Sequence, residues 1–215
     1  AVGARRERPA IAGIDRPHVF DGDQLRDLLG ASGEGAAGLP LRARIAIALG
    51  RWLGLTSEPG RLRRWSKRYM PLGRRVAIVG GGLVGCELAE FLADRGREVT
   101  VFEEGEVFGV GFAHPRRWRV LYELRERGVR LEPGARVVEI GDGEVHFERK
   151  AASGGLTSEV VSADHVLIAS GLVENRALAR ALEREGFRIV EIGDGTGVGY
   201  IEGAIHGGYE AAEAV

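Results

Sequence analysis

The fold is decided by residues 74–105, RRVAIVGGGLVGCELAEFLADRGREVTVFEEG. This stretch opens with a short apolar run at 76–79, which is typical of a strand buried on both faces. Glycines follow directly, and apolar residues then recur at helical spacing, at Val84, Leu88, Phe91 and Leu92. Gly96 ends the predicted helix, and the β-branched and aromatic residues 98–104 predict a second strand. We therefore expect a βαβ unit with a right-handed parallel crossover.

The turn between the first strand and the helix reads Gly80-Gly81-Gly82-Leu83-Val84-Gly85 and fits G-x-G-x-x-G. Gly80 permits the tight turn, Gly82 lets the backbone approach a diphosphate, and Gly85 allows close packing of helix on strand. The first-turn amides and the helix dipole then face the phosphates. The hexapeptide predicts a dinucleotide site, and the alternative is a glycine-rich turn without a ligand.

An acidic residue stands where an adenosine ribose would be bound. Glu103 lies 21 residues after Gly82, at the end of the second strand. Its carboxylate, with that of Glu104, would repel a 2′-phosphate, which favours NAD(H) over NADP(H). A solvated acid at a strand end is the alternative interpretation. Arg116 and Arg117, at the start of the next helix, are possible partners for a 2′-phosphate.

The rest of the chain extends this α/β pattern. Before a boundary near Gly73 we expect three short helices, at about 21–30, 41–53 and 57–69. Beyond residue 105 we expect helices at 115–127, 175–185 and from 200 onward, strands at 129–131, 165–169 and 188–192, and an antiparallel meander over 136–161. The predicted fold class is α/β: a Rossmann-like three-layer parallel sheet with an antiparallel β-meander and an N-terminal helical insertion.

Composition excludes several classes of protein. The net charge of −1 gives no bulk field for nucleic acid or for an anionic membrane, and no apolar run reaches a membrane span. The basic cluster at 61–75 is read as a solvated or docking face. The single cysteine, Cys86, excludes an internal disulfide and a cysteine-based cluster, and it is read as packing rather than as a reactive thiol. The five scattered histidines show no metal-ligand spacing.

Short-chain dehydrogenases are excluded because none of the four tyrosines is followed by lysine in a Tyr-x-x-x-Lys pattern. We expect no catalytic side chain in this chain. A cytoplasmic location is expected.

The stretch 74–105 resembles the pyridine-nucleotide domain of the two-dinucleotide-domain flavoprotein oxidoreductases. More narrowly, it is similar to the C-terminal half of the 2,4-dienoyl-CoA reductase and NADH:flavin oxidoreductase (old yellow enzyme-like) group. The opening Ala1-Val2-Gly3-Ala4-Arg5, with Pro9, Gly13 and Ile14, is similar to that group's A-T-G-x-x-P-x-x-P-G-I segment, with Val in place of Thr. Ile192-Gly193-Asp194 and the following Ala204–Gly208 are similar to its G-D segment and helix.

The resemblance implies roles for residues beyond the glycine loop. It implies that Asp194 binds FAD, that Glu103 and the turn Ala169-Ser170-Gly171 line the NAD site, and that Glu87 reaches toward the nicotinamide. From the residues alone, Asp194 is also compatible with a cap and Glu87 with complementing the helix dipole. The implied domains are a partial FAD segment (1–20), a helical insertion (21–73), an NAD(P)-binding domain (74–171) and a return to the FAD domain (172–215).

The family's first glycine loop, for FAD, its barrel for FMN and its four-cysteine cluster are not in this sequence. We therefore expect an excised portion of a larger enzyme, inactive alone, whose partners are the missing N-terminal FAD half and an FMN/iron–sulfur barrel. In the complete enzyme, NAD(P)H would pass hydride to FAD for reduction of an enone or enoyl substrate. The alternative is a stand-alone, non-catalytic module that binds or senses NAD(H).

Overall fold

The computed structural model describes residues 3–22, 24, 48, 70–151 and 154–213. The chain divides into two compact units, which are treated separately. Unit 1 consists of Ala1–Pro9 and Gly171–Val215, and unit 2 of Ala10–Ser170.

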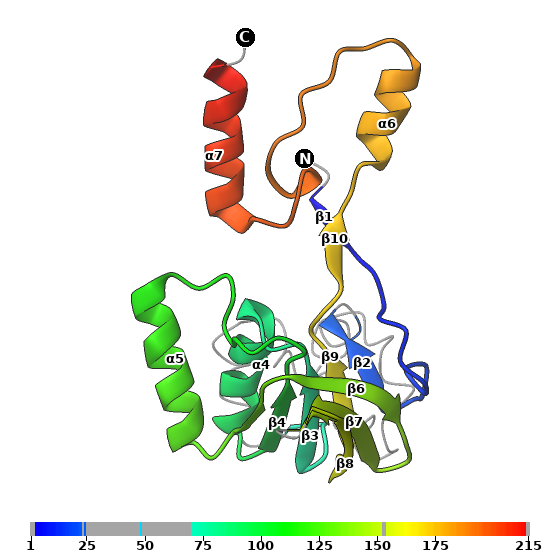
Figure 1. Ribbon diagram of the computed structural model, residues 1–215, viewed down its shortest axis with the longest axis vertical. Helices are drawn as coiled ribbons and strands as arrows, with labels where there is room; N and C mark the ends of the chain where they lie inside the picture. Colours follow the sequence, from blue (N-terminus) through cyan, green and yellow to red (C-terminus); the bar gives the residue numbers. More distant parts are fainter. Residues whose placement is uncertain (1–2, 23, 25–47, 49–69, 152–153, 214–215) are drawn as a thin grey trace. The chain divides into compact units, whose positions relative to one another are not determined.

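Unit 2 is built on a parallel sheet (Figure 1). Its strands, in spatial order, are β2 (Val19–Asp21), β9 (His165–Ile168), β3 (Arg75–Val79), β4 (Glu98–Phe102) and β5 (Arg130–Glu132). Val76 lies opposite Val99 on one side and opposite His165 on the other, so β3 is central and paired on both edges. The predicted βαβ unit is confirmed, and the carboxyl ends of β3 and β4 lie at one edge of the sheet.

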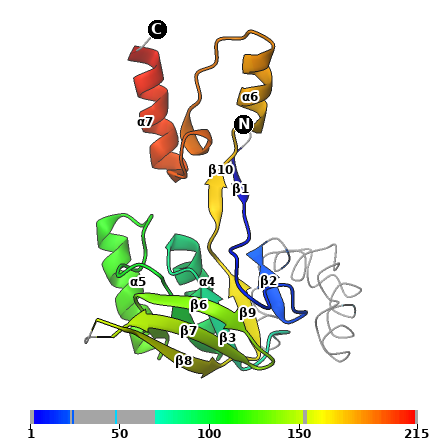
Figure 2. The same cartoon turned by 45° about the vertical axis from the view of Figure 1, so that its right-hand side comes forward.

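Two helices cover one face of this sheet and a meander covers the other (Figure 2). The helices are α4 (Leu83–Ala93) and α5 (His114–Glu126), and the meander strands are β6 (Ala135–Ile140), β7 (Glu144–Lys150) and β8 (Leu156–Ser162). Because side chains alternate along a strand, Val76 and Ile78 pack with the helices, whereas Ala77 packs with the meander. Phe102 meets Phe147 of β7 at a ring-centroid distance of 4.9 Å. The three-layer α/β fold predicted from the sequence is thus confirmed.

The predicted insertion at 21–73 lies almost entirely outside the described residues. At its start, the Asp21 carboxylate accepts a hydrogen bond from the Gln24 amide at 2.9 Å, and the Gln24 side chain accepts one from the Asp21 amide at 3.0 Å. This reciprocal pair is a capping box, so Asp21 has the bonds of an N-cap at the start of the helix expected at about 21–30. Of the basic cluster at 61–75, Arg74 pairs with Glu98 and Arg75 with Asp164.

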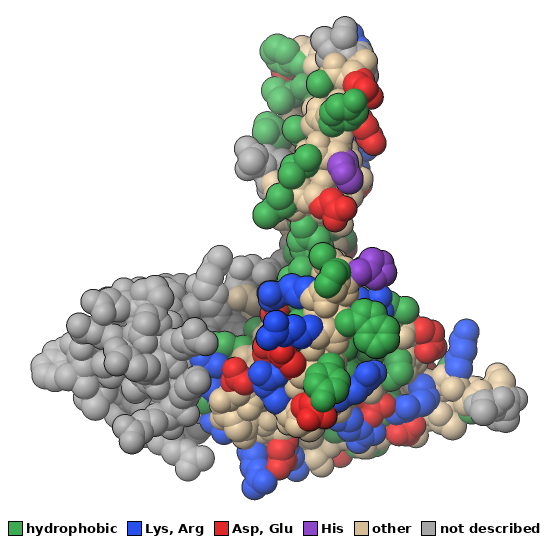
Figure 3. Space-filling model, turned by 90° about the vertical axis from the view of Figure 1, so that its left-hand side faces the viewer, with side chains coloured by type: hydrophobic (Ala, Val, Ile, Leu, Met, Phe, Trp, Pro, Cys, Tyr) green, Lys and Arg blue, Asp and Glu red, His purple; other side chains and the backbone are tan. Residues whose placement is uncertain are grey.

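Unit 1 contains an antiparallel strand pair, β1 (Ala4–Arg6) with β10 (Leu172–Glu174). Three further elements follow β10, namely α6 (Ala177–Arg184), the 3-10 turn η2 (Gly193–Gly195) and α7 (Tyr200–Glu213). Glu7 donates its amide to the Gly171 carbonyl at 2.6 Å and continues the strand pair by one bond. Hydrophobic side chains lie on the surface of this unit (Figure 3).

The strand predicted at 188–192 is wrong, because these residues form an irregular segment in the structure. The Glu191 carboxylate accepts hydrogen bonds from the Arg176 guanidinium, and Val190 and Ile192 are exposed. A strand needs a hydrogen-bonded neighbour, and no described strand of unit 1 pairs with this segment. The apolar residues at 189, 190 and 192 suggested a strand but did not specify a partner.

Candidate functional site

The glycine loop lies between β3 and α4, and its first glycine is required by the turn. Gly80 has φ +107°, a conformation that residues with a side chain rarely adopt. A Cβ at this position would lie 2.9 Å from the Ser170 Cβ and 3.0 Å from the Ala169 carbonyl carbon. The Gly80 amide donates to the Phe102 carbonyl at 2.8 Å, which ties the turn to the end of β4.

Gly85 and Gly81 are required by packing. A Cβ on Gly85 would lie 1.8 Å from the Gly80 carbonyl oxygen, so only glycine lets the helix approach the turn this closely. A Cβ on Gly81 would lie 2.4 Å from the Phe108 ring. The chain's own atoms therefore explain three of the loop's glycines.

Gly82 differs from these three glycines. It is the N-cap of α4 with an ordinary φ of −69°, which any residue can adopt. A Cβ there would meet only the Val110 carbonyl oxygen, at 3.6 Å, which is ordinary van der Waals contact. Neither the backbone conformation nor the packing needs a glycine here, so its small size leaves space at the start of the helix.

Glu103 lies beside this loop, half-buried at the end of β4. Its Oε2 accepts a hydrogen bond from the Gly81 amide at 2.7 Å, and its Oε1 accepts one from the Gly105 amide at 3.0 Å. A carboxylate oxygen can accept more than one hydrogen bond, so both oxygens keep acceptor capacity. The structure thus brings the sequence-predicted acid and the glycine loop together.

The first-turn amides of α4 are only partly open in this structure. The Leu83 amide donates to the Val110 carbonyl at 2.9 Å. Among the described residues, no acceptor bonds the amides of Gly82 and Val84, as expected at a helix N-terminus. The positive end of the α4 dipole remains at this point, but the Leu83 amide, one of the first-turn donors, is already bonded within the chain.

The segment that supplies this carbonyl, residues 108–111, was not singled out from the sequence. Gly109 donates its amide to the Gly81 carbonyl at 2.7 Å, and Phe108 is buried against the loop. Arg117 Nε donates to the Phe108 carbonyl at 2.7 Å. The signal in the sequence was the close spacing of Gly105, Gly109 and Gly111, which marks a loop but does not say what it covers.

The arginines considered for a 2′-phosphate are both engaged. The Arg117 guanidinium donates to the Phe108 carbonyl. Arg116 pairs with Glu87 of α4 at 3.3 Å and lies over the Phe112 ring at 5.4 Å. Glu87, expected to reach toward a nicotinamide, is exposed and forms this ion pair across the two helices.

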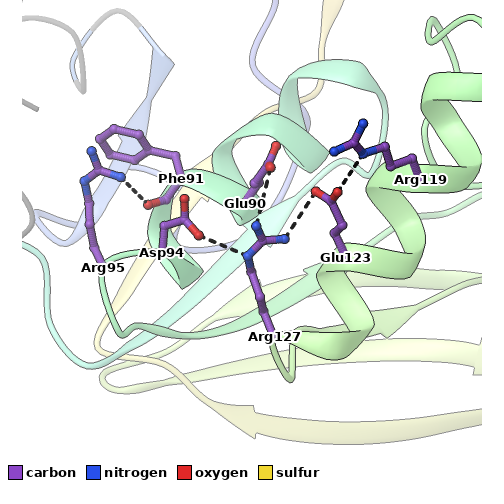
Figure 4. A network of polar contacts seen from close by, with 7 residues as sticks. All are labelled: Glu90, Phe91, Asp94, Arg95, Arg119, Glu123 and Arg127. Carbon is purple, nitrogen blue, oxygen red and sulfur yellow. Dashed lines mark hydrogen bonds and ion pairs between the residues drawn. The ribbon is translucent and has the colours of Figure 1, made fainter.

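Other charged side chains form ion pairs within α5 and between α5 and α4 (Figure 4). Arg127, just beyond α5, pairs with Asp94 at 3.0 Å, with Glu123 at 3.5 Å and with Glu90 at 3.8 Å. Arg119 pairs with Glu123 at 2.8 Å. Arg127 thus links the end of α5 to α4, the helix that follows the glycine loop.

Cys86 packs beneath the loop. Its side chain is fully buried, and its Sγ donates to the Gly81 carbonyl at 3.3 Å. Burial raises the pKa of the Cys86 thiol to about 11, so it remains protonated at neutral pH. Its surroundings are those of a packing residue rather than of a reactive thiolate.

The two remaining predicted residues lie in unit 1. Gly171 has φ +83°, and a Cβ there would lie 1.9 Å from the carbonyl oxygen of Glu7, the residue after β1, so this close approach explains the glycine. Asp194 Oδ1 accepts hydrogen bonds from the amides of Gly199 at 3.1 Å and Tyr200 at 3.0 Å. Asp194 therefore caps the start of α7.

The described part of the chain contains no group of three or more His, Cys, Asp or Glu side chains placed to hold a metal ion. No helix within it is both long enough and apolar enough to cross a bilayer.

Comparisons with known proteins agree with this geometry. The sequence profile of the family described as pyridine nucleotide-disulphide oxidoreductase matches residues 1–194. The NADH oxidase of Thermoanaerobacter brockii is 30% identical over 140 residues, 64% of this chain and 21% of that protein. The bilirubin reductase of Mediterraneibacter gnavus is 30% identical over 217 aligned positions, 100% of this chain and 27% of that protein.

A solved structure of 2-naphthoyl-CoA reductase with 2-naphthoyl-CoA has the same fold. It aligns with a TM-score of 0.63 at 24% identity, over 98% of this chain and 25% of that chain. This likeness is one of fold alone. The chain thus spans about a quarter of the length of these three proteins.

Proposed function

The chain belongs to the pyridine nucleotide-disulphide oxidoreductase family, and from this premise we propose that unit 2 binds NAD(H) at residues Gly80–Gly85. The observation that carries the proposal is Gly82, whose lack of a side chain serves neither the backbone nor the packing. A diphosphate lying over Gly82 accounts for the space, and the amides of Gly82 and Val84 supply donors to it. The NADH oxidase among the relatives supports NADH as the ligand.

Glu103 favours NADH over NADPH in this proposal. Its carboxylate is held beside the loop by the Gly81 and Gly105 amides and can accept bonds from ribose hydroxyls. A 2′-phosphate would meet this negative charge, while Arg116 and Arg117 are engaged elsewhere. We therefore expect NADH to bind more tightly than NADPH.

The wider proposal is a portion of a flavin-dependent oxidoreductase similar to the 2,4-dienoyl-CoA reductase and NADH:flavin oxidoreductase group. Bound NADH would supply a hydride for FAD, and an enone or enoyl substrate would be reduced elsewhere in the enzyme. In this proposal Asp194 would bind FAD through Oδ2, because its Oδ1 already accepts the amides of Gly199 and Tyr200. The rest of that site, and a barrel for FMN and an iron–sulfur cluster, would come from outside these residues.

A stand-alone module that binds or senses NAD(H) is the second candidate. It is favoured by the completeness of unit 2, whose sheet is covered on both faces by its own elements. The reading frame on both sides of the 215 residues distinguishes the two, because an upstream glycine loop for FAD would decide for the enzyme.

Calorimetric titration of the full chain with NADH and with NADPH tests the binding proposal. Glu103→Gln keeps an acceptor for the Gly81 amide but removes the charge, so we expect the preference for NADH to fall about tenfold. Glu126→Gln is the matched control, because it removes the same charge from an exposed acid at the last residue of α5, at the other end of the helix from Arg117. Absence of NADH binding at millimolar ligand would rule out the site, and an unchanged preference in Glu103→Gln would rule out its selectivity.

A further inference from the structure

We propose that Gly109-Val110-Gly111, here called the strap, lies over the proposed diphosphate site at the start of α4 and moves away from it when the nucleotide binds. The inference rests on the proposed function. Its basis is the Val110 carbonyl, which accepts the Leu83 amide at 2.9 Å. The same oxygen is the nearest atom to the space beside Gly82, at 3.6 Å from where a Cβ would stand. A protein acceptor thus occupies the place where a phosphate oxygen would accept the same amide.

The tip of the strap is built to move. Gly109 and Gly111 flank Val110 with φ values of +70° and +98°, and glycine changes between such conformations without a steric penalty. The Val110 side chain is 64% exposed, so packing does not hold it in place. Rotation of the peptide unit that carries the Val110 carbonyl is therefore sufficient to free the Leu83 amide.

The base of the strap is fixed. The Phe108 side chain is buried in the core with α4 and α5, and its carbonyl accepts Arg117 Nε at 2.7 Å. The Gly109 amide is bonded to the Gly81 carbonyl at 2.7 Å. Because Phe108 and the Gly109 amide are held, movement is confined to Val110 and Gly111. The glycine loop Gly80–Gly85 keeps its position.

A closed strap lowers the apparent affinity for the nucleotide. Only molecules with the strap open bind, so the apparent dissociation constant is the intrinsic one divided by the open fraction. Rotation of the peptide unit between Val110 and Gly111 gives up the bond from the Leu83 amide but is compatible with the turn bond from the Phe112 amide to the Gly109 carbonyl. One hydrogen bond is worth about a three- to tenfold change in that equilibrium. A substitution that disfavours the closed tip should therefore tighten NADH binding by about that factor.

Gly111→Ala is the discriminating variant. Alanine is strained at the positive φ of Gly111, so the closed conformation loses stability. Gly128→Ala is the matched control, because Gly128 also has a positive φ, of +74°, and lies after α5 with open space around its Cβ position. Both full-chain variants are titrated with NADH by calorimetry, and exchange of the Leu83 amide is followed by NMR without ligand.

The expected result is an NADH dissociation constant three- to tenfold lower in Gly111→Ala and unchanged in Gly128→Ala. The Leu83 amide should exchange faster in Gly111→Ala, while that of Cys86, bonded to the Gly82 carbonyl, stays protected. If the wild-type chain binds NADH and Gly111→Ala binds it no more tightly, the strap is refuted and the NAD(H) site stands. If neither chain binds NADH, the site itself is refuted and the strap falls with it.

Discussion

The two units of this chain bury their apolar residues very differently. In unit 2, both faces of the parallel sheet are covered, and residues such as Ile78, Val101 and Phe147 are fully buried. In unit 1, α7 buries no residue, and Ile201, Ile205 and Tyr209 form an exposed stripe at helical spacing. The comparison indicates that unit 2 has the core of an independently stable domain, whereas unit 1 has short strands and an uncovered helix.

The largest expected effect comes from one alanine in each unit. Gly85→Ala places a Cβ 1.8 Å from the Gly80 oxygen, and Gly171→Ala places one 1.9 Å from the Glu7 oxygen. We expect Gly85→Ala to lower the free energy of unfolding of unit 2 by about 3 kcal/mol. Gly171→Ala should disrupt β1 and β10 and leave the main thermal transition in place. Calorimetric unfolding measures both, and a main transition equally lowered by Gly171→Ala would show that the units unfold as one.

A buried carboxylate provides the next test of unit 2. The Glu132 side chain is 7% exposed and accepts hydrogen bonds from Arg130 and, at 2.5 Å, from Arg149 of the meander. Glu132→Ala should cost about 2 kcal/mol, less than a fully buried pair, because both arginines reach solvent. Urea unfolding measures this cost, with the exposed Glu126→Ala as the control. If Glu132→Ala lowered the free energy of unfolding no more than the control does, the meander would be held by its apolar contacts alone.

The stability of unit 2 should depend on pH through His165. This residue is 8% exposed, its Nδ1 accepts the Gly73 amide at 2.9 Å, and burial, followed by the nearby His18, lowers its pKa. The unfolded chain takes up a proton near the ordinary pKa of about 6.5, and the folded chain does so only at lower pH. The free energy of unfolding should therefore decrease as pH falls from about 6.5 toward the lowered value. His165→Asn should flatten this slope and the exposed His114→Gln should not; equal slopes in all three proteins would contradict the prediction.

The smallest effects should come from the ion pairs of α5. Arg127→Ala removes pairs with three carboxylates on a partly exposed surface and should cost less than about 1 kcal/mol. Arg119→Ala, which loses a single exposed pair with Glu123, should leave the thermal midpoint unresolved from the wild type. Salt titration checks both, since screening by salt should remove the difference between Arg127→Ala and the wild type.

The sequence predicted unit 2 well because its signals are local. Each element is visible within a short stretch of sequence: the apolar run at 76–79, the helical spacing from Val84, and the β-branched and aromatic residues of the strand that ends near Glu103. The meander was recognisable from alternation between glycine turns, and the structure pairs Val145 with Val161 in the antiparallel register that such turns produce.

The features that the sequence did not predict depend on partners distant in the chain. The strand expected at 188–192 lacks a neighbour among the described residues, while the short β10 found one in β1. Nothing in the spacing of Gly109 and Gly111 indicated that the Val110 carbonyl would accept the Leu83 amide. Local patterns specify an element, but only tertiary contacts specify which donor meets which acceptor.

The most direct measurement is NADH titration of Gly82→Ala beside the wild-type chain. A Cβ at residue 82 fits the structure, so the melting temperature should change by no more than a few degrees, the cost of an altered N-cap. It also stands where the diphosphate would lie, so NADH affinity should fall at least about tenfold. A Gly82→Ala chain that melts like the wild type and binds NADH equally well would contradict the central claim that this space is kept for a dinucleotide.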